Sequence, residues 1–243
     1  MSTTPEGPST PAERPNGLAT YFKVLFSPGD AFATLARFPM WGWAAIGGIV
    51  LTLIGVIILM PATLHFIHAT QAQRLGQMPA DQAATARQAM AKIPDIVYQA
   101  SGLIGGLIGV WIFWLIGAVV YVIGAALTGG EAKFIGAWVI AVNIYIIGAV
   151  GSVINNIIVM LRGAENVNTQ ADLLALPSLA MLIHGSPKLE AFLYYGFNIF
   201  NVWLYIVAVI ALERVMKMSR GASIATVVVL ALLGAGLGAL FAR

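Results

Sequence analysis

Two long stretches without a charged residue stand back to back in this sequence. The first runs from Ile96 to Gly130 and the second from Phe134 to Leu161. Each exceeds the roughly 20 residues that an α-helix needs to cross a bilayer. The pattern predicts a helical hairpin inside a membrane, with spans at about residues 98–127 and 134–160 and a short turn between them: Thr128-Gly129-Gly130-Glu131-Ala132-Lys133.

The overall composition indicates the same class of protein. Hydrophobic residues make up 59% of the 243 residues and charged residues 9%, against roughly 25% charged in soluble domains. We therefore expect a polytopic membrane protein that contacts membrane lipids. The chain has no cysteine, which excludes disulfides, thiolate catalysis and cysteine-ligated metals. Its net charge of +3 suits an anionic lipid surface. The sequence has no basic cluster interleaved with polar or aromatic residues that could recognise bases, so we expect no nucleic-acid partner.

The N-terminal forty residues differ from the rest of the chain. Residues 1–19 contain four prolines among polar residues, a composition typical of a disordered tail. Residues 20–39 show helical spacing of apolar side chains, and Ser27 followed by Pro28 predicts the start of a second short helix. Lys23 and Arg37 flank this amphipathic segment. It either lies on the cytoplasmic leaflet or packs onto the helical bundle.

Three further apolar stretches complete the predicted transmembrane domain. They cover about residues 43–64, 189–212 and 224–241, and Trp41 and Trp43 precede the first of them as interfacial anchors. The fold class is therefore all-α, with five transmembrane helices within residues 40–243. The polar segment 65–94 predicts an extramembrane helix after Pro79. The apolar patch Leu173–Ile183 is too short to span, so it is interfacial or re-entrant.

The distribution of basic residues predicts the orientation in the membrane. Arg214, Lys217 and Arg220 crowd the short connection before the last span, whereas the basic residues between the first two spans are spread over a longer polar loop. Lysine and arginine are enriched in short cytoplasmic loops. We therefore place the N-terminus and the turn at Gly129 in the cytoplasm.

Polar residues inside the spans are the candidate functional residues. Ser152, Asn155 and Asn156 share one face of the third span at helical spacing, and Asn198 and Asn201 share a face of the fourth. Amides inside a bilayer need hydrogen-bond partners, so these faces should meet protein. Interhelical hydrogen bonding is the first interpretation. A polar pathway or small-ligand site, extended by Asn143 and Tyr145, is the second, although no intramembrane ionisable residue accompanies it.

Other patterns do not favour catalysis. The spacings Gly102-xxx-Gly106, Gly105-xxx-Gly109 and Gly234-xxx-Gly238 allow close helix packing, within the protomer or at an oligomer seam. His65 and His68 lie one turn apart but lack a third ligand nearby in the sequence. His184-Gly185-Ser186 lacks the sequence of a nucleophile elbow, and no phosphate-binding glycine loop is present. We expect no catalytic residue, metal or cofactor.

Four stretches together carry a resemblance to a known family: Val24–Phe32, the Trp41 region, the cytoplasmic hinge (Gly129, Gly130, Glu131 and Lys133, continuing to Phe134), and Phe200–Trp203 leading to Lys217–Ser219. They resemble the bacterial branch of the Yip1-domain family. The resemblance implies a five-span protein with a cytoplasmic N-terminus, of a family whose eukaryotic members bind Rab GTPases in vesicle trafficking. The Asp-Leu-Tyr-Gly-Pro sequence of those members is missing, and no proline follows Tyr145 in the third span, where many relatives carry one.

Two functional hypotheses follow. The first is a non-enzymatic scaffold, adaptor or membrane-organising protein of the bacterial cytoplasmic membrane, which binds a protein partner or forms a homo-oligomer. The second is a lipid or small-solute carrier or channel that uses the polar face of the third and fourth spans.

Overall fold

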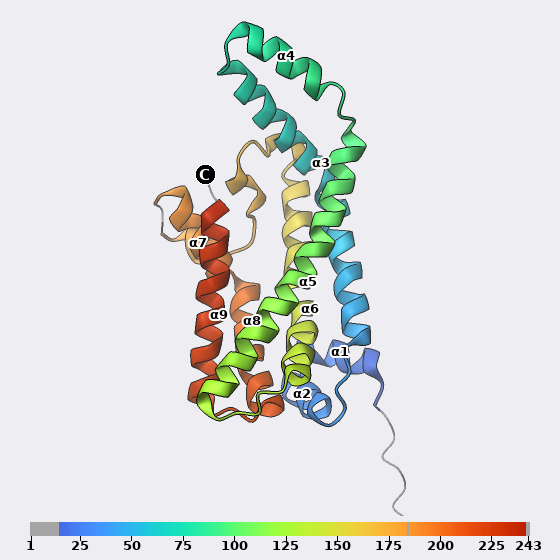
Figure 1. The fold of residues 1–243 in the computed structure, drawn as a ribbon, viewed down its shortest axis with the longest axis vertical. Helices are drawn as coiled ribbons and strands as arrows, with labels where there is room; N and C mark the ends of the chain where they lie inside the picture. Colours follow the sequence, from blue (N-terminus) through green and yellow to red (C-terminus); the bar gives the residue numbers. More distant parts are fainter. Residues whose placement is uncertain (1–14, 184, 242–243) are drawn as a thin grey trace, which may run out of the picture.

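The computed structural model describes residues 15–183 and 185–241, and the described chain is helical apart from one isolated bridge between Ser178 and Asn198. The helices form an elongated bundle (Figure 1). In chain order they are α1 (Gly17–Phe26), α2 (Pro28–Arg37), α3 (Gly42–Gly76), α4 (Ala80–Met90), α5 (Asp95–Thr128), α6 (Phe134–Leu161), the short 3-10 helices η1 (Ala164–Asn166), η2 (Gln170–Leu173) and η3 (Leu179–Met181), then α7 (Pro187–Phe197), α8 (Ile199–Val215) and α9 (Arg220–Phe241).

Four described helices, α3, α5, α6 and α9, are long and apolar enough to cross a membrane. Helix α3 continues to Gly76, well past the expected end of the first span at Leu64, and it contains Pro61 in its interior. Helices α3 and α5 project beyond the bundle, where α4 connects them (Figure 1). The polar segment after Pro79 forms the helix that its sequence predicts.

Helix α6 is the centre of the bundle. In its most apolar stretch 61% of the residues are buried, against 22% in α3 and in α5. It packs against α3, α5 and α8. Because α6 is surrounded, the buried polar groups on it must find partners within the chain, whereas much of the apolar surface of α5 faces outward.

The predicted fourth span is interrupted, which corrects the expectation of one continuous helix over 189–212. Helix α7 ends at Phe197, Asn198 has extended backbone angles, and α8 begins at Ile199. Asparagine favours such breaks because its side chain bonds to nearby backbone groups in competition with the helix. Helix α7 packs against α9, and α8 continues to the other end of the bundle (Figure 1).

The N-terminal helices pack onto the bundle. Tyr21 and Val24 of α1, and Phe32 and Leu35 of α2, are buried, and α2 lies against α8. Helix α2 begins at Pro28, as predicted, although the Ser27 side chain makes no capping hydrogen bond. Helix α1 begins at Gly17, within the expected tail of residues 1–19; residues 1–14 of that tail lie outside the described residues.

Candidate functional site

Asn155 is the most highly connected polar residue inside the bundle. Its Oδ1 accepts hydrogen bonds from Tyr194 Oη at 2.7 Å and from Ala175 N at 2.8 Å. Its Nδ2 donates to the carbonyl of Leu173 at 2.9 Å and to Asn156 Oδ1 at 3.2 Å. All four hydrogen-bonding positions of the amide are occupied. Asn155 thus ties α6 to both α7 and the loop that precedes it.

These bonds also place the apolar patch Leu173–Ile183. The backbone of Leu173 and Ala175 bonds to Asn155, and the amide of Ile199 donates to the carbonyl of Pro177 at 3.2 Å. Part of the patch forms η3, a single short turn. The patch therefore folds back against α6 and against the break between α7 and α8.

The sequence spacing places Asn156 and Ser152 on the same helical face as Asn155, but the three side chains have different surroundings. Asn156 Nδ2 donates to the Gly55 carbonyl at 2.9 Å, which joins α6 to α3. The Ser152 hydroxyl makes no hydrogen bond to any residue that the structure describes, and Ser152 is exposed. The predicted polar face is thus divided between two neighbours, with Ser152 between them.

Asn198 and Asn201 do not share a helical face, which corrects the sequence interpretation. Asn198 precedes α8 as its N-cap: its Oδ1 accepts from the amides of Phe200 and Asn201, each at 3.0 Å. Its Nδ2 donates to the Tyr194 carbonyl at 3.1 Å, and the Asn201 side chain bonds to the carbonyl of Tyr195. Both asparagines therefore satisfy backbone groups that the helix break exposes.

A cavity of about 330 Å³ lies beside these residues, between α6 and α8, and is named the α6–α8 cavity. Four of the five predicted polar residues line it: Ser152, Asn155, Asn198 and Asn201. Sequence reasoning missed Tyr194 and Tyr195, which also line it. The sequence feature that could have revealed them is a pair of adjacent hydroxyl-bearing residues inside an apolar stretch.

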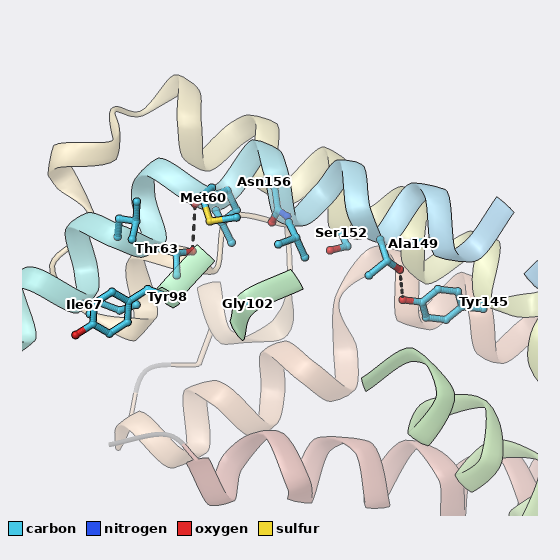
Figure 2. A pocket seen from close by; sticks show the side chains of 13 residues that line it. Met60, Thr63, Ile67, Tyr98, Gly102, Tyr145, Ala149, Ser152 and Asn156 are labelled. Carbon is cyan, nitrogen blue, oxygen red and sulfur yellow. Dashed lines mark hydrogen bonds between the residues drawn. The ribbon is translucent and has the colours of Figure 1, made fainter. Parts of the chain in front are cut away.

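A second cavity of about 310 Å³ lies between α3, α5 and α6, and is named the α3–α5–α6 cavity (Figure 2). Ser152 and Leu59 line both cavities. The Thr52 hydroxyl lies 2.9 Å from the Tyr145 hydroxyl, so these two side chains bridge α3 and α6. The predicted polar path through Asn143 does not extend here, because Asn143 Nδ2 donates to the carbonyls of Met40 and Val139.

The hinge between α5 and α6, formed by Gly129, Gly130, Glu131 and Lys133, closes this hairpin tightly. Gly129 has φ of +78°, the left-handed conformation that commonly ends a helix at glycine. A Cβ on Gly130 would lie 2.9 Å from the Met216 carbonyl oxygen. The amide of Glu131 donates to that same carbonyl at 2.7 Å, and Lys133 lies 3.0 Å from the Glu131 carboxylate. The hydrogen bond and the charge of Lys133 lower the pKa of Glu131.

The sequence model of the Yip1 domain family matches residues 22–242, nearly the whole chain. The chain belongs to the Yip1 domain family. The match includes every helix from α2 to α9 and therefore both cavities and the hinge. Together with its four long apolar helices, this membership identifies an integral membrane protein. No curated protein and no solved structure matches the chain.

The two predicted interfacial anchors of this Yip1-domain protein lie where α3 begins. Trp41 packs edge-on against Trp138 of α6, with ring centroids 6.2 Å apart, and keeps 39% of its surface exposed. Trp43 is 53% exposed, and it lies against Gly17 of α1. Each indole thus combines a packed part with an exposed part, as expected of a residue at a membrane boundary.

The overlapping glycine motifs of the Yip1-domain protein have different surroundings. A Cβ on Gly106 would meet Val56 of α3 at 3.1 Å, and Gly102 lines the α3–α5–α6 cavity. Gly105 and Gly109 line neither cavity, and a Cβ on either would meet nothing within 4 Å. The first motif therefore lies beside α3 and the α3–α5–α6 cavity, whereas the second leaves α5 open to its surroundings.

His68 has a carboxylate partner that the sequence spacing did not reveal. Its Nε2 lies 3.2 Å from Asp95 Oδ1, across the extension formed by α3 and α5. Next to this pair, Gln71 donates to the Tyr98 hydroxyl at 3.0 Å. No group of three metal-ligating side chains occurs in the described part of the Yip1-domain protein. This cluster fastens the two long helices together where they leave the bundle.

Of the triplet at 184–186, His184 lies outside the described residues, and Ser186 caps α7.

Proposed function

We propose that this Yip1-domain protein acts by association and not by catalysis, as a scaffold, adaptor or membrane-organising factor of the bacterial cytoplasmic membrane. Its contacts are membrane lipids and a second copy of the chain or a protein partner. It crosses the membrane five times, with α7 and α8 together forming the fourth crossing. Its N-terminus is cytoplasmic, which the basic residues Arg214, Lys217 and Arg220 before α9 support.

The outward face of α5 carries this proposal. Gly105 and Gly109 leave open space on the helix surface, and Ile104, Ile108 and Ile112 beside them are exposed. Small residues at this spacing let a second helix approach closely in a bilayer, where dispersion contacts drive association. By contrast, the Asn155 side chain, inside the bundle, makes all four of its hydrogen bonds to other groups of the same chain. Contact with other helices is therefore the activity that these faces support.

Cross-linking and size measurement in mild detergent test the association. We expect a defined oligomer or a stoichiometric partner, and we expect Gly105→Leu combined with Gly109→Leu to lower its yield at least tenfold. Gly102→Leu is the control, because it makes the same kind of change on the same helix at a position that lines the α3–α5–α6 cavity. A monomer without a reproducible partner would contradict the proposal, as would equal loss in the control.

The N-terminal helices supply the contact with the lipid surface. Leu18, Phe22 and Phe26 of α1 follow at intervals of four residues and are exposed, whereas Tyr21 and Val24 are buried in the bundle. We place the exposed row among the headgroups of the cytoplasmic leaflet. A nitroxide label on Phe22→Cys should be more accessible to oxygen than to a water-soluble nickel complex. The reverse preference would place α1 in water.

A carrier of lipids or small solutes is the second candidate, favoured by the α6–α8 cavity. The cavity brings Ser152, Asn155, Asn198 and Asn201 together with two tyrosines. Flux through liposomes that contain the purified protein tests this function. Asn201→Leu should then reduce the flux while the protein stays folded. Unchanged flux in this variant would leave the asparagines with a structural role only.

A further inference from the structure

The α3–α5–α6 cavity is partly open to its surroundings, is lined by the exposed residues Gly102 and Ser152, and has unused hydrogen-bonding capacity. Ser152 faces this space with a hydroxyl that is not bonded to any described residue (Figure 2). Thr52 and Thr63 instead donate back to carbonyls one turn earlier, those of Gly48 and Leu59. A polar group without a partner in a bilayer costs free energy, so the Ser152 hydroxyl calls for a partner that the described chain does not supply.

The donors and acceptors that remain free define the chemistry of such a partner. Because Thr52 donates to the Gly48 carbonyl at 2.8 Å, the proton in its 2.9 Å contact with Tyr145 comes from the tyrosine. Tyr145 and Thr63 therefore present free acceptor lone pairs to the cavity. Ser152 has a free O–H, and Asn156 has a second N–H beyond the one that bonds to Gly55. A ligand with a hydroxyl group, or with an ester next to a hydroxyl, can donate to these free acceptors and accept from these free donors.

Apart from Tyr98, whose hydroxyl accepts a hydrogen bond from Gln71, the remaining walls are apolar, and none of them carries a formal charge. The described lining contains no aspartate, glutamate, lysine, arginine or histidine, so it offers no ion pair to a phosphate, a carboxylate or an amine. The volume of about 310 Å³ lies at the lower end of the range for small-ligand sites, roughly 300–1,000 Å³. The apolar wall consists of Val56, Leu59, Met60, Leu64, Ile67 and Ala149.

We infer that the α3–α5–α6 cavity binds an uncharged amphiphile of the monoacylglycerol class. The hydroxyl-bearing head bonds to Ser152 and to the Thr52–Tyr145 pair, and part of the acyl chain lies along the apolar wall. This site is separate from the association face, since Gly105 and Gly109 do not line the cavity. It is also independent of the proposed scaffold function.

Photolabelling of the full chain in lipid nanodiscs tests the inference. The probe is a monoacylglycerol with a diazirine in its acyl chain, and the competitors are 1-oleoylglycerol, oleate and phosphatidylglycerol. We expect saturable labelling of α3 and α6 that 1-oleoylglycerol abolishes and the two charged competitors leave in place. Labelling that does not saturate, or that phosphatidylglycerol removes equally well, would overturn the assignment.

Two variants on α5 separate a specific site from general helix–lipid contact. Gly102 lines the cavity (Figure 2), and a Cβ there would meet nothing within 4 Å, so Gly102→Leu adds a side chain at the cavity from an open position. We expect it to lower saturable labelling at least tenfold. Gly105→Leu makes the same change at an equally open position outside the cavity and should leave labelling unchanged. Equal effects of the two variants would overturn the site.

A third variant removes one hydrogen bond without filling the cavity. Ser152→Ala should weaken probe binding about fivefold, the usual net effect of one hydrogen bond. Unchanged binding would contradict the role of the hydroxyl. Failure of the association proposal has a different signature, because it would appear as indifference of the oligomer to Gly105→Leu with Gly109→Leu while Gly102→Leu still abolishes labelling.

Discussion

Tyr194 of α7 donates its hydroxyl proton to Asn155 Oδ1 of α6 across 2.7 Å. Both residues are buried, and the same amide oxygen accepts from the backbone of Ala175. The helix break at Asn198 follows four residues later in the chain. The position of α7, and hence the shape of the α6–α8 cavity, depends on this junction.

Loss of the Asn155 amide should destabilise the fold substantially. Asn155→Leu leaves the Tyr194 hydroxyl, the Ala175 amide and the Leu173 carbonyl without their partner. Each buried polar group left unsatisfied costs about 1–3 kcal/mol, so we expect a loss of about 3 kcal/mol in the free energy of unfolding. Tyr194→Phe should cost about 1 kcal/mol. Unfolding in mild detergent measures both variants, and Asn155→Leu should cost less in the Tyr194→Phe background than alone.

The N-cap of α8 gives a separate prediction. Asn198→Ala removes the acceptor for the amides of Phe200 and Asn201 and should lower the free energy of unfolding by about 1 kcal/mol. Asn198→Ser keeps a capping oxygen and should recover most of that loss. Equal destabilisation by the two substitutions would mean that the bond to the Tyr194 carbonyl, and not the cap, is what matters.

The two hinge glycines should differ in the reason for their sensitivity. Gly129→Asn places a residue that tolerates the left-handed conformation at φ +78° and should be milder than Gly129→Ala. Gly130→Ala places a Cβ 2.9 Å from the Met216 carbonyl oxygen and 2.7 Å from Met218 Cγ. It should therefore shift the α8–α9 connection. Thermal unfolding ranks the three variants, and we expect Gly129→Asn to be the most stable.

The sequence was sufficient for the long helices and insufficient for the broken one. The uncharged runs around Gly129 predicted α5 and α6 within a few residues, because hydrophobic length and a left-handed glycine are local signals. The break at Asn198 is different: the surrounding residues are apolar, and the asparagine acts as a cap only because it bonds to Tyr194 and because the preceding loop folds back on α6. That information is not local.

The candidate site, like the fold, could be predicted from the sequence only in part. Its polar residues were visible as amides in apolar stretches, but their partners were not, since Asn156 bonds to a glycine carbonyl about one hundred positions away. Likewise, Asp95 meets His68 only because α3 and α5 extend side by side beyond the bundle. Gly102 lines the α3–α5–α6 cavity and Gly105 does not, and this difference depends on how α5 is rotated about its axis relative to α3. The spacing of the glycines in the sequence does not determine that rotation.

The loop before α7 should loosen in acid. Partial burial raises the pKa of Asp172, but hydrogen bonds from the amide and hydroxyl of Thr169 and the amide of Asn168 outweigh it, so that this pKa lies below its ordinary value. A lowered pKa in the folded state contributes stability above the ordinary pKa of about 3.9. That stability is lost as the pH falls through the folded value. The protection factor of the Thr169 amide, which compares its exchange rate with that of an unstructured chain at the same pH, should therefore fall below about pH 4, and in Asp172→Asn it should lose this pH dependence.

The fourth crossing can be tested directly because the chain has no cysteine. Gln82 of α4, Glu165 of η1 and Ser219 before α9 are exposed, and each can be replaced by a single cysteine. In right-side-out spheroplasts, a membrane-impermeant maleimide should label Gln82→Cys and Glu165→Cys, whereas Ser219→Cys should react only after permeabilisation. The physical reason is that α7 and α8 together lead the chain from the end of the bundle near α4 to the end near α2 (Figure 1). Labelling of Glu165→Cys and Ser219→Cys from the same side would exclude this crossing, and labelling of Ser219→Cys alone would reverse the orientation.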